Sequence, residues 1–441
     1  MDYEEALNWI MSYWKSGRPK AQEKALRALK VPRMRALLER IGSPHLKYPS
    51  ILVAGTKGKG STAAFIAEGL MSAGYRVGRY TQPHLTDWRE RTWVDGRIIE
   101  PRQVVKLVER IKAPVEDLNR AMGELGGLTT YEIGTALTLA YFADRQVEVA
   151  VLEIGVGGRL DALNAVEPVL SLVTSISLDH TDVLGDTLAE IAREKAGVFR
   201  QGRAAVTAPQ HPDAEEALRQ AAMEAGTHLY IVGKDWRWRE SPKQRDGSID
   251  IDGLEGAITG VRLPLLGDHQ RDNATVATVA LQLLRREGFQ KIDEEAIRRG
   301  LESVEWPGRI QLIRRDPFVV VDAAHNEDSA RRLLQTVQAH FPYERLTLVF
   351  GASEDKDLAG MARVLGPAAH RVVVTASGHR RAADVGKLES EFARYCKVGV
   401  ELNPQEALQW ALREAEPKDL ILVTGSVFLV GRAIQILSAT S

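Results

Sequence analysis

Short apolar runs alternate with amphipathic stretches along most of the chain. Four such runs, each followed by glycine, proline or a polar turn, lie at residues 51–54 (ILVA), 149–154 (VAVLEI), 170–177 (LSLVTSIS) and 204–207 (AAVT). After residues 306–308 (WPG) the pattern starts again, with runs at 318–322, 346–351, 372–377 and 420–425. Apolar strands separated by helical patterns are typical of a parallel sheet with helices on both faces. The pattern therefore predicts an α/β protein with two domains, each built on a mainly parallel sheet.

The break between the two series of strands places the domain boundary. We expect an N-terminal domain over residues 1–297, a linker over 298–310 and a smaller C-terminal domain over 311–441. In the second domain the strands end in small and polar clusters, namely DAAHN, GASEDKD, TASGH and TGS. Ligands of such sheets bind beyond the carboxyl ends of the strands, so these tips could form one wall of a cleft. Turns alone also favour these residue types, which leaves a purely structural interpretation open.

The stretch VAGTKGKGST, residues 53–62, carries the clearest chemical pattern. It joins an apolar strand to an apolar helical pattern through glycines at 55, 58 and 60 and a lysine at 59. Glycines let the backbone wrap an anion closely, and a helix N-terminus directs N–H groups toward it. Lys59 would neutralise phosphate charge, and Ser61 or Thr62 could bind Mg²⁺. Because a glycine separates the lysine from the serine, the spacing departs from the usual phosphate loop, and a turn without phosphate is the alternative.

Composition narrows the partners and the compartment. The formal net charge is −1 and no basic stripe is visible, so a nucleic-acid partner is not expected. No run of about 18 apolar residues suggests a membrane span, and the first residues do not resemble a signal peptide. Cys396 is the only cysteine, which excludes an internal disulfide and suits the reducing cytoplasm. We therefore expect a cytoplasmic protein with small-molecule partners and no membrane partner.

Nine stretches of the sequence together resemble one known family. They are VAGTKGKGST, YTQPHL (80–85), VLEIGVGGRLDALN (151–164), SISLDHTDVLGDTLAEIAREKAGVF (175–199), LLGDHQRDNATVA (265–277), WPGR (306–309), VDAAHNEDS (321–329), GASEDKD (351–357) and VTGSVFLVG (423–431). In order and spacing they are similar to the folylpolyglutamate synthase/dihydrofolate synthase family of the Mur ligase superfamily. The resemblance implies an N-terminal P-loop ATPase domain with a mainly parallel sheet and a smaller, Rossmann-like α/β C-terminal domain.

The resemblance implies an ATP-dependent amide ligase. Members of this family activate a carboxylate as an acyl phosphate, and the amino group of L-glutamate then displaces phosphate. The carboxylate belongs to dihydropteroate or to the terminal glutamate of a reduced folate, so a bifunctional enzyme is implied. Because the reaction brings a carboxylate to a triphosphate, cations must neutralise the negative charges of the two groups. ATP, two Mg²⁺ ions and a monomeric state are implied as well.

The resemblance also implies roles for individual residues. Catalytic roles fall on Lys59, Glu153, His180 and Lys195. ATP contacts fall on Gly55, Thr56, Gly58, Lys59, Gly60, Ser61, Thr62, Asn273, Arg309, Asp322 and His325. Metal ligands are Ser61, Glu153, His180 and Lys195, the last as a carbamate, because the matching lysine is commonly carbamylated in this family. Pterin or folate contacts fall on Gln82, Pro83, His84, Arg91 and Asp161.

Four of these residues also have a simpler interpretation. Lys195 could be a solvated cation at the end of a surface helix, with Gly197 as C-cap. Asn273 could be a polar residue at a helix N-terminus. Glu153 could be a solvated acid at a strand end, and His180 a structural hydrogen-bonding group.

Departures from the family pattern leave the acceptor specificity open. The loop reads GTKGKGS where the family often has GTNGKGS, so Lys57 adds a charge near the phosphates. Gln82, Ala323 and Glu327 replace the more frequent Ser, Gly and Pro.

Two rival functions stay open. One is a Mur-type peptidoglycan amino-acid ligase, although such enzymes usually carry a separate N-terminal domain for their nucleotide sugar and only about 50 residues precede this loop. The other is an ATP-binding switch or pseudo-ligase without catalysis. The presence of Glu153, His180 and Lys195 together argues against a switch, which has no need of two metals.

Overall fold

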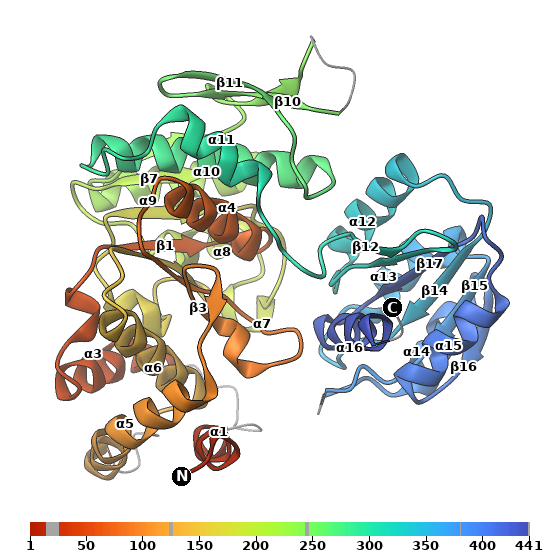
Figure 1. Ribbon diagram of the computed structural model, residues 1–441, viewed down its shortest axis with the longest axis horizontal. Helices are drawn as coiled ribbons and strands as arrows, with labels where there is room; N and C mark the ends of the chain where they lie inside the picture. The colour runs from red at the N-terminus through yellow and green to blue at the C-terminus, as the bar shows by residue number, and fades with distance from the viewer. Residues whose placement is uncertain (15–25, 123–126, 243–246, 380, 440–441) are drawn as a thin grey trace. The chain divides into compact units, whose positions relative to one another are not determined.

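The computed structural model describes residues 1–14, 26–122, 127–242, 247–379 and 381–439, and it divides the chain into two compact units (Figure 1). Unit 1 comprises Met1–Gln82, Arg89–Pro264 and Gln270–Val304, and unit 2 comprises Pro83–Trp88, Leu265–His269 and Glu305–Ser441. Two short segments that precede unit 2 in sequence therefore pack within it. The predicted α/β class is confirmed.

Unit 1 is built on an eight-stranded sheet with the order β4-β3-β2-β5-β1-β6-β7-β8. Its strands are β1 (Ser50–Ala54), β2 (Val77–Tyr80), β3 (Thr92–Val94), β4 (Arg97–Ile98), β5 (Val149–Glu153), β6 (Leu170–Val173), β7 (Ala204–Thr207) and β8 (His228–Ile231). The strands from β2 to β8 along this order are parallel, and β3 and β4 add an antiparallel edge. All four predicted runs are strands, although the run at 170–177 leaves the sheet after Val173.

The centre of this sheet determines where the loops meet. Strand β1 lies between β5 and β6, and Val53 pairs with Glu153 on one side and Leu172 on the other. Because these strands are parallel, the loops that follow them leave the sheet at the same edge. Such a point, where the chain turns to opposite sides of a sheet, is where doubly wound folds bind ligands.

The described α-helices that accompany this sheet are α1 (Tyr3–Ser12), α3 (Lys30–Arg40), α4 (Lys59–Ser72), α5 (Pro101–Met122), α6 (Thr130–Asp144), α7 (Thr181–Leu184), α8 (Leu188–Ala196), α9 (Pro212–Ala225), α10 (Asp268–Arg286) and α11 (Glu294–Glu302). Helix α4 is largely buried because it lies between the sheet and α11 (Figure 1). Gly69 and Gly300 permit this close packing, since a Cβ on Gly300 would lie 2.4 Å from the Cα of Gly69.

Helix α11 corrects the predicted linker. The helix extends to Glu302 and buries Ile297 and Leu301 on one apolar face, so the first part of the expected linker 298–310 is helical. A second feature that the sequence pattern did not predict is a small antiparallel sheet of β9 (Trp238–Glu240), β10 (Ile249–Gly253) and β11 (Gly256–Val261).

Unit 2 is built on a six-stranded sheet with the order β12-β13-β17-β14-β15-β16, in which only β12 is antiparallel to its neighbour. Its strands are β12 (Gln311–Arg314), β13 (Phe318–Val321), β14 (Leu346–Phe350), β15 (Arg371–Val374), β16 (Lys397–Val400) and β17 (Leu420–Thr424). Its helices are α12 (Glu327–His340), α13 (Leu358–Leu365), α14 (Val385–Phe392), α15 (Pro404–Glu414) and α16 (Val427–Ser438). The four predicted strands are confirmed, and the edge strands β12 and β16 are additional.

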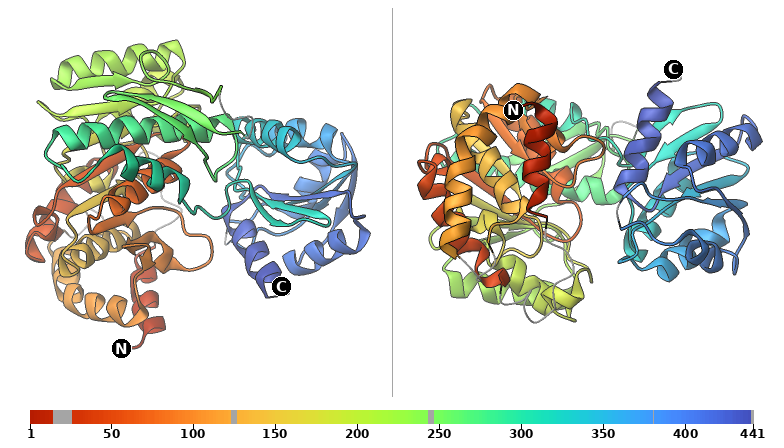
Figure 2. Two further views of the ribbon diagram at one scale, coloured as in Figure 1. Left: turned by 45° about the horizontal axis from the view of Figure 1, so that its top comes forward. Right: turned by 90° about the horizontal axis from the view of Figure 1, so that it is seen from below.

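Alternation along these strands creates two apolar cores in unit 2. Val320 and Leu422 belong to the core with α12, α13 and α14, whereas Val321 and Val423 belong to the core with α15 and α16. Figure 2 shows this unit from two further directions, with helices on both faces of the strands. The strand tips contact one another, because the Gly425 N–H donates to the Ala324 carbonyl at 3.1 Å.

No described helix combines the length and the apolar character needed to cross a membrane.

Candidate active site

The glycine-rich loop joins β1 to α4 at the centre of the unit 1 sheet, and two of its glycines cannot be replaced without strain. Gly55 has φ +141°, and a Cβ there would lie 1.9 Å from Thr174 Oγ1. Gly58 has φ +85°, and a Cβ there would lie 2.4 Å from Asn273 Oδ1. The loop therefore lies tightly between the segment that follows β6 and helix α10.

Helix α4 begins immediately after this loop, at Lys59. The first backbone N–H groups of a helix have no acceptor within the helix and favour an anion. Ser61 and Thr62 lie in this first turn and are buried, and Thr62 Oγ1 has no hydrogen-bond partner within the described part of the chain. The predicted strand, loop and helix start are confirmed, in a form suited to a phosphate group.

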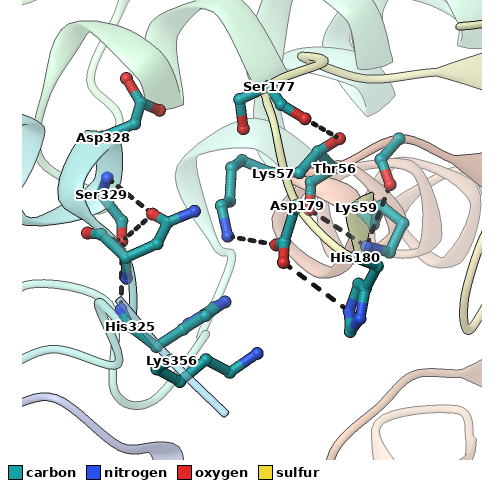
Figure 3. Close-up of polar contacts among 12 residues, drawn as sticks. Thr56, Lys57, Lys59, Ser177, Asp179, His180, His325, Asp328, Ser329 and Lys356 are labelled. Carbon is teal, nitrogen blue, oxygen red and sulfur yellow. Dashed lines mark hydrogen bonds and ion pairs between the residues drawn. The ribbon is translucent and has the colours of Figure 1, made fainter. Parts of the chain in front are cut away.

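Lys59 lies over the loop from which it extends. Its ammonium group donates to the carbonyl oxygens of Gly55 and Thr56, each at 3.2 Å (Figure 3). The positive charge is thus held beside the backbone that would surround a phosphate.

Lys195 reaches the same loop from the end of α8. It is only 3% exposed, and its ammonium group donates to the Gly55 carbonyl at 2.8 Å. The interpretation as a solvated surface cation is therefore wrong. Burial lowers the pKa of Lys195 well below 10.5, and the positive charges of Lys59 and Lys57 lower it further, against the opposing effect of Asp179. A lowered pKa favours the neutral amine that carbamylation requires.

Glu153 is the last residue of β5, and His180 lies in the segment that follows β6. Glu153 is 4% exposed and accepts a hydrogen bond from the Gln82 N–H at 3.0 Å, so it is not a solvated acid. His180 precedes α7 with φ 51°, and its Nε2 lies 3.8 Å from Asp179 Oδ1. Its side chain is 43% exposed, which leaves the ring accessible to a ligand.

The oxygen-bearing side chains of this region fit one Mg²⁺ ion that also binds substrate phosphates. Mg²⁺ typically uses one or two protein ligands with phosphate and water oxygens. Ser61 at the start of α4 and Glu153 at the end of β5 supply a hydroxyl and a carboxylate. Within the described ranges, no group of three or more His, Cys, Asp or Glu side chains is arranged to hold a metal.

Asn273 lies against the same loop from α10. It is 4% exposed, its Nδ2 donates to Gln270 Oε1 at 3.0 Å, and its Oδ1 faces Gly58. Because α10 begins at Asp268, Asn273 is inside the helix and the helix N-terminal interpretation is wrong.

Unit 2 brings Arg309, Asp322 and His325 to the tip of β13. The two carboxylate oxygens of Asp322 accept hydrogen bonds from the Ile310 N–H at 2.9 Å and the Ala324 N–H at 2.8 Å. Burial raises the pKa of Asp322, against the opposing charge of Arg309. The His325 ring lies with its Nδ1 2.9 Å from the Ala323 carbonyl oxygen.

The expected pterin residues are divided between the units. Gln82, Arg91 and Asp161 belong to unit 1, whereas Pro83 and His84 belong to unit 2. Gln82 and Asp161 converge on Gly155, where a Cβ would lie 2.9 Å from Gln82 Nε2 and 3.2 Å from Asp161 Oδ2. The His84 ring packs edge-on against Phe428, with their centroids 5.9 Å apart.

Three residues of the site were not predicted from sequence. Tyr131 donates to Asp161 Oδ1 at 2.7 Å, Gln270 orients Asn273, and Asp179 pairs with Lys57 at 2.9 Å. Asp179 and Gln270 stand in the motifs that contain His180 and Asn273, so their proximity in sequence was the available signal.

Comparisons with known proteins identify the family of this chain. Residues 105–281 match the Mur ligase middle domain, and residues 308–427 match the Mur ligase glutamate ligase domain. The chain is 33% identical to the Bacillus subtilis protein named dihydrofolate synthase/folylpolyglutamate synthase, over 97% of each chain.

Solved structures show the same relationship. Mycobacterium tuberculosis folylpolyglutamate synthase complexed with ADP is 30% identical with a TM-score of 0.88, and the alignment covers 99% of this chain and 98% of that one. Escherichia coli FolC in complex with DHPP and ADP is 30% identical with a TM-score of 0.87, over 100% of this chain and 98% of that one. The chain belongs to the folylpolyglutamate synthase/dihydrofolate synthase family, whose members are ATP-dependent ligases of the Mur ligase superfamily.

Proposed function

We propose that this protein joins L-glutamate to dihydropteroate and to reduced folate glutamates, with ATP as the energy source and ADP and phosphate as products. The observation that carries the proposal is that Lys59 and Lys195 both donate to the Gly55 carbonyl of the phosphate loop, which follows β1 beside the strand that ends at Glu153. This convergence supports activation of a carboxylate by phosphoryl transfer.

The phosphate loop and α4 bind the triphosphate of ATP through Gly55, Thr56, Gly58, Gly60 and the first-turn N–H groups. Lys59 stabilises the charge that develops on the γ-phosphoryl group as the acceptor carboxylate attacks it. Ser61 and Glu153 would hold Mg²⁺, which supplies further neutralisation of phosphate charge when bound.

The acceptor carboxylate becomes an acyl phosphate, and the amino group of L-glutamate then attacks the acyl carbon and releases phosphate. Gln82, Pro83, His84, Arg91 and Asp161 are proposed to contact the pterin or folate. The nucleotide is further contacted by Asn273, Thr62, Arg309, Asp322 and His325. A role in binding is supported for Asn273 by its position against Gly58.

A carbamate on Lys195 is proposed to hold a second Mg²⁺ ion with His180. The lowered pKa of Lys195 supports this modification, because CO₂ reacts with a neutral amine. A monomeric state and a cytoplasmic location stay predictions from the sequence.

The decisive experiment measures phosphate release by the purified protein with ATP, Mg²⁺ and L-glutamate, and with either dihydropteroate or tetrahydrofolate as acceptor. We expect release only when glutamate and an acceptor are both present, with a glutamylated product detectable by mass spectrometry for each acceptor. Activity with one acceptor alone would reduce the proposal to a single synthase. ATP binding without release would favour a pseudo-ligase, and glutamylation of a nucleotide-linked muramyl substrate would favour a peptidoglycan ligase.

A further inference from the structure

Lys57, a residue in which this loop departs from the family's common pattern, forms an ion pair across the site. Its ammonium group lies 2.9 Å from Asp179 Oδ2, and each of the two side chains is 15% exposed (Figure 3). The two residues are separated by 122 positions in sequence. The pair therefore links the loop that follows β1 to the segment that follows β6.

Backbone contacts strengthen the same link. The N–H groups of Thr56 and Lys57 both donate to the Ser175 carbonyl, at 2.9 Å and 3.0 Å. Thr56 Oγ1 also donates to the Ser177 carbonyl at 3.3 Å. Because the phosphate loop and residues 175–179 share these bonds, a displacement of one segment displaces the other.

The pair reaches His180 through the carboxylate of Asp179. Oδ2 of this carboxylate faces Lys57, and Oδ1 lies 3.8 Å from His180 Nε2. His180 has a left-handed backbone with φ 51°, a strained conformation for a residue other than glycine that persists only where neighbours hold it. Residues 175–179 are the chain that enters this conformation, so their attachment to the phosphate loop helps to maintain it.

We propose that Lys57 is a positioning residue: its ion pair with Asp179 holds His180 in register with the phosphate loop and so couples nucleotide binding to divalent-metal binding. The proposal rests on the proposed function only in so far as the loop binds a nucleotide and His180 binds a metal. No atom of Lys57 needs to contact the substrate.

A purely electrostatic role predicts a different result. If Lys57 acted only through its charge, removing it would tighten binding of a nearby cation, whereas removing the charge of Asp179 would weaken it. If the pair positions His180, losing either partner weakens metal binding, and losing both adds little, because neighbouring residues that act as a unit are not additive.

The test measures Mn²⁺ affinity by electron paramagnetic resonance in the presence of saturating ADP, for Lys57→Met, Asp179→Asn and the double variant. We expect Mn²⁺ to bind about tenfold more weakly in all three variants, as for other residues that orient metal ligands. Lys57→Arg should stay within about twofold of wild type because it preserves the ion pair. Lys234→Met, which removes an exposed ion pair with Glu215, is the matched control and should bind as wild type does.

A second measurement separates positioning from direct phosphate contact. ADP affinity measured by calorimetry in EDTA should change less than twofold in Lys57→Met, whereas a lysine that binds phosphate directly would lose affinity severalfold. Circular dichroism checks folding, and Lys57→Gln replaces the Met variant if that variant is unstable.

The outcomes distinguish this inference from the proposed function. Tighter Mn²⁺ binding in Lys57→Met, or additive losses in the double variant, would overturn the positioning role. Failure of the wild-type protein to bind ADP at all would instead overturn the proposed function.

Discussion

The carboxyl edges of the two main sheets use similar small and polar residues but hold their buried charges in different ways. At the edge of unit 1, two ammonium groups, those of Lys59 and Lys195, donate to the single carbonyl of Gly55. At the edge of unit 2, the carboxylate of Asp322 accepts hydrogen bonds from two backbone N–H groups. Two lysine amino groups therefore share one acceptor at the first edge, while the buried carboxylate of the second is balanced by the charge of Arg309 and by backbone N–H groups.

This difference indicates a division of labour. Lysines that lie close together favour a bound anion, and their proximity lowers the pKa of the buried one, Lys195. A carboxylate satisfied by backbone N–H groups instead stabilises the conformation of its own loop. We expect substitutions in unit 1 to affect chemistry and metal binding first, and substitutions in unit 2 to affect folding and substrate affinity first.

The largest expected effect follows from Lys59→Ala. Removing this cation from the phosphate loop should lower kcat on the order of a hundredfold or more, because preorganised charge at a developing negative charge contributes that much. Steady-state phosphate release measures it, with Lys234→Ala as the control. Turnover near that of wild type would show that the positive edge of unit 1 does not carry the chemistry.

Lys195→Ala should lower activity roughly tenfold to a hundredfold if its carbamate orients a metal. Acetate or formate added to this variant should restore part of the activity by occupying the position of the lost carboxylate. Mass spectrometry under native conditions should find the carbamate on wild-type protein in bicarbonate buffer. An active enzyme that shows an unmodified ammonium at this position would contradict the proposal.

In unit 2, Asp322→Asn should lower the free energy of unfolding by about 1–3 kcal/mol. In the wild type each carboxylate oxygen accepts one backbone N–H, and in the variant the amide N–H₂ would replace one of these oxygens and leave a backbone N–H without an acceptor. Urea denaturation measures the change. Asp328→Asn is the control, since Asp328 forms a partly exposed pair with Arg332 at 3.1 Å and such pairs contribute little. Equal effects of the two variants would remove the contrast between the edges.

The buried amine of Lys195 also predicts a pH dependence. Its folded pKa is lowered below 10.5, so the unfolded chain binds more protons between the folded pKa and 10.5. The free energy of unfolding should therefore rise with pH in that window, by at most about 1.4 kcal/mol per pH unit. Chemical denaturation in CO₂-free buffer should show this slope in wild type relative to Lys195→Met, and parallel curves would contradict it.

The smallest expected effect is that of Gly58→Ala on ADP affinity, and a comparison with Gly74→Ala separates backbone strain from contact with the site. Gly58→Ala and Gly74→Ala both place a side chain at positive φ, of +85° and +79°, at a cost of roughly 1–2 kcal/mol each. Only at Gly58 does the new Cβ meet Asn273, so only that variant should bind ADP about tenfold more weakly, which corresponds to ~1.4 kcal/mol. Isothermal calorimetry compares the two, and equal ADP affinities would show that the Gly58–Asn273 approach has no role in binding.

Part of this protein is readable from local sequence. Strands such as β1 and β14 were predicted because uninterrupted apolar runs suit strands that are buried on both faces. The phosphate loop was predicted because its glycines, lysine and helix start lie within ten residues. These features depend on periodicity and on backbone conformations that a short segment determines by itself.

Other features depend on residues far apart in sequence. Strand β2 escaped prediction because it contains Arg79, which is 5% exposed only because it stacks 4.7 Å from the Trp93 ring and lies 3.9 Å from Glu68. Segments 83–88 and 265–269 belong to unit 2 because they pack against it, which the local sequence does not determine.

The lysines of the site show most clearly which features local sequence cannot predict. The sequence by itself determined that a lysine would stand at the phosphate loop, since Lys59 lies within the loop motif. It did not determine that Lys195 is buried, because that depends on how α8 packs against the loop, nor that Lys57 pairs with Asp179 across 122 residues. Burial and charge pairing are set by the surroundings of a side chain, and only the tertiary structure brings those surroundings together.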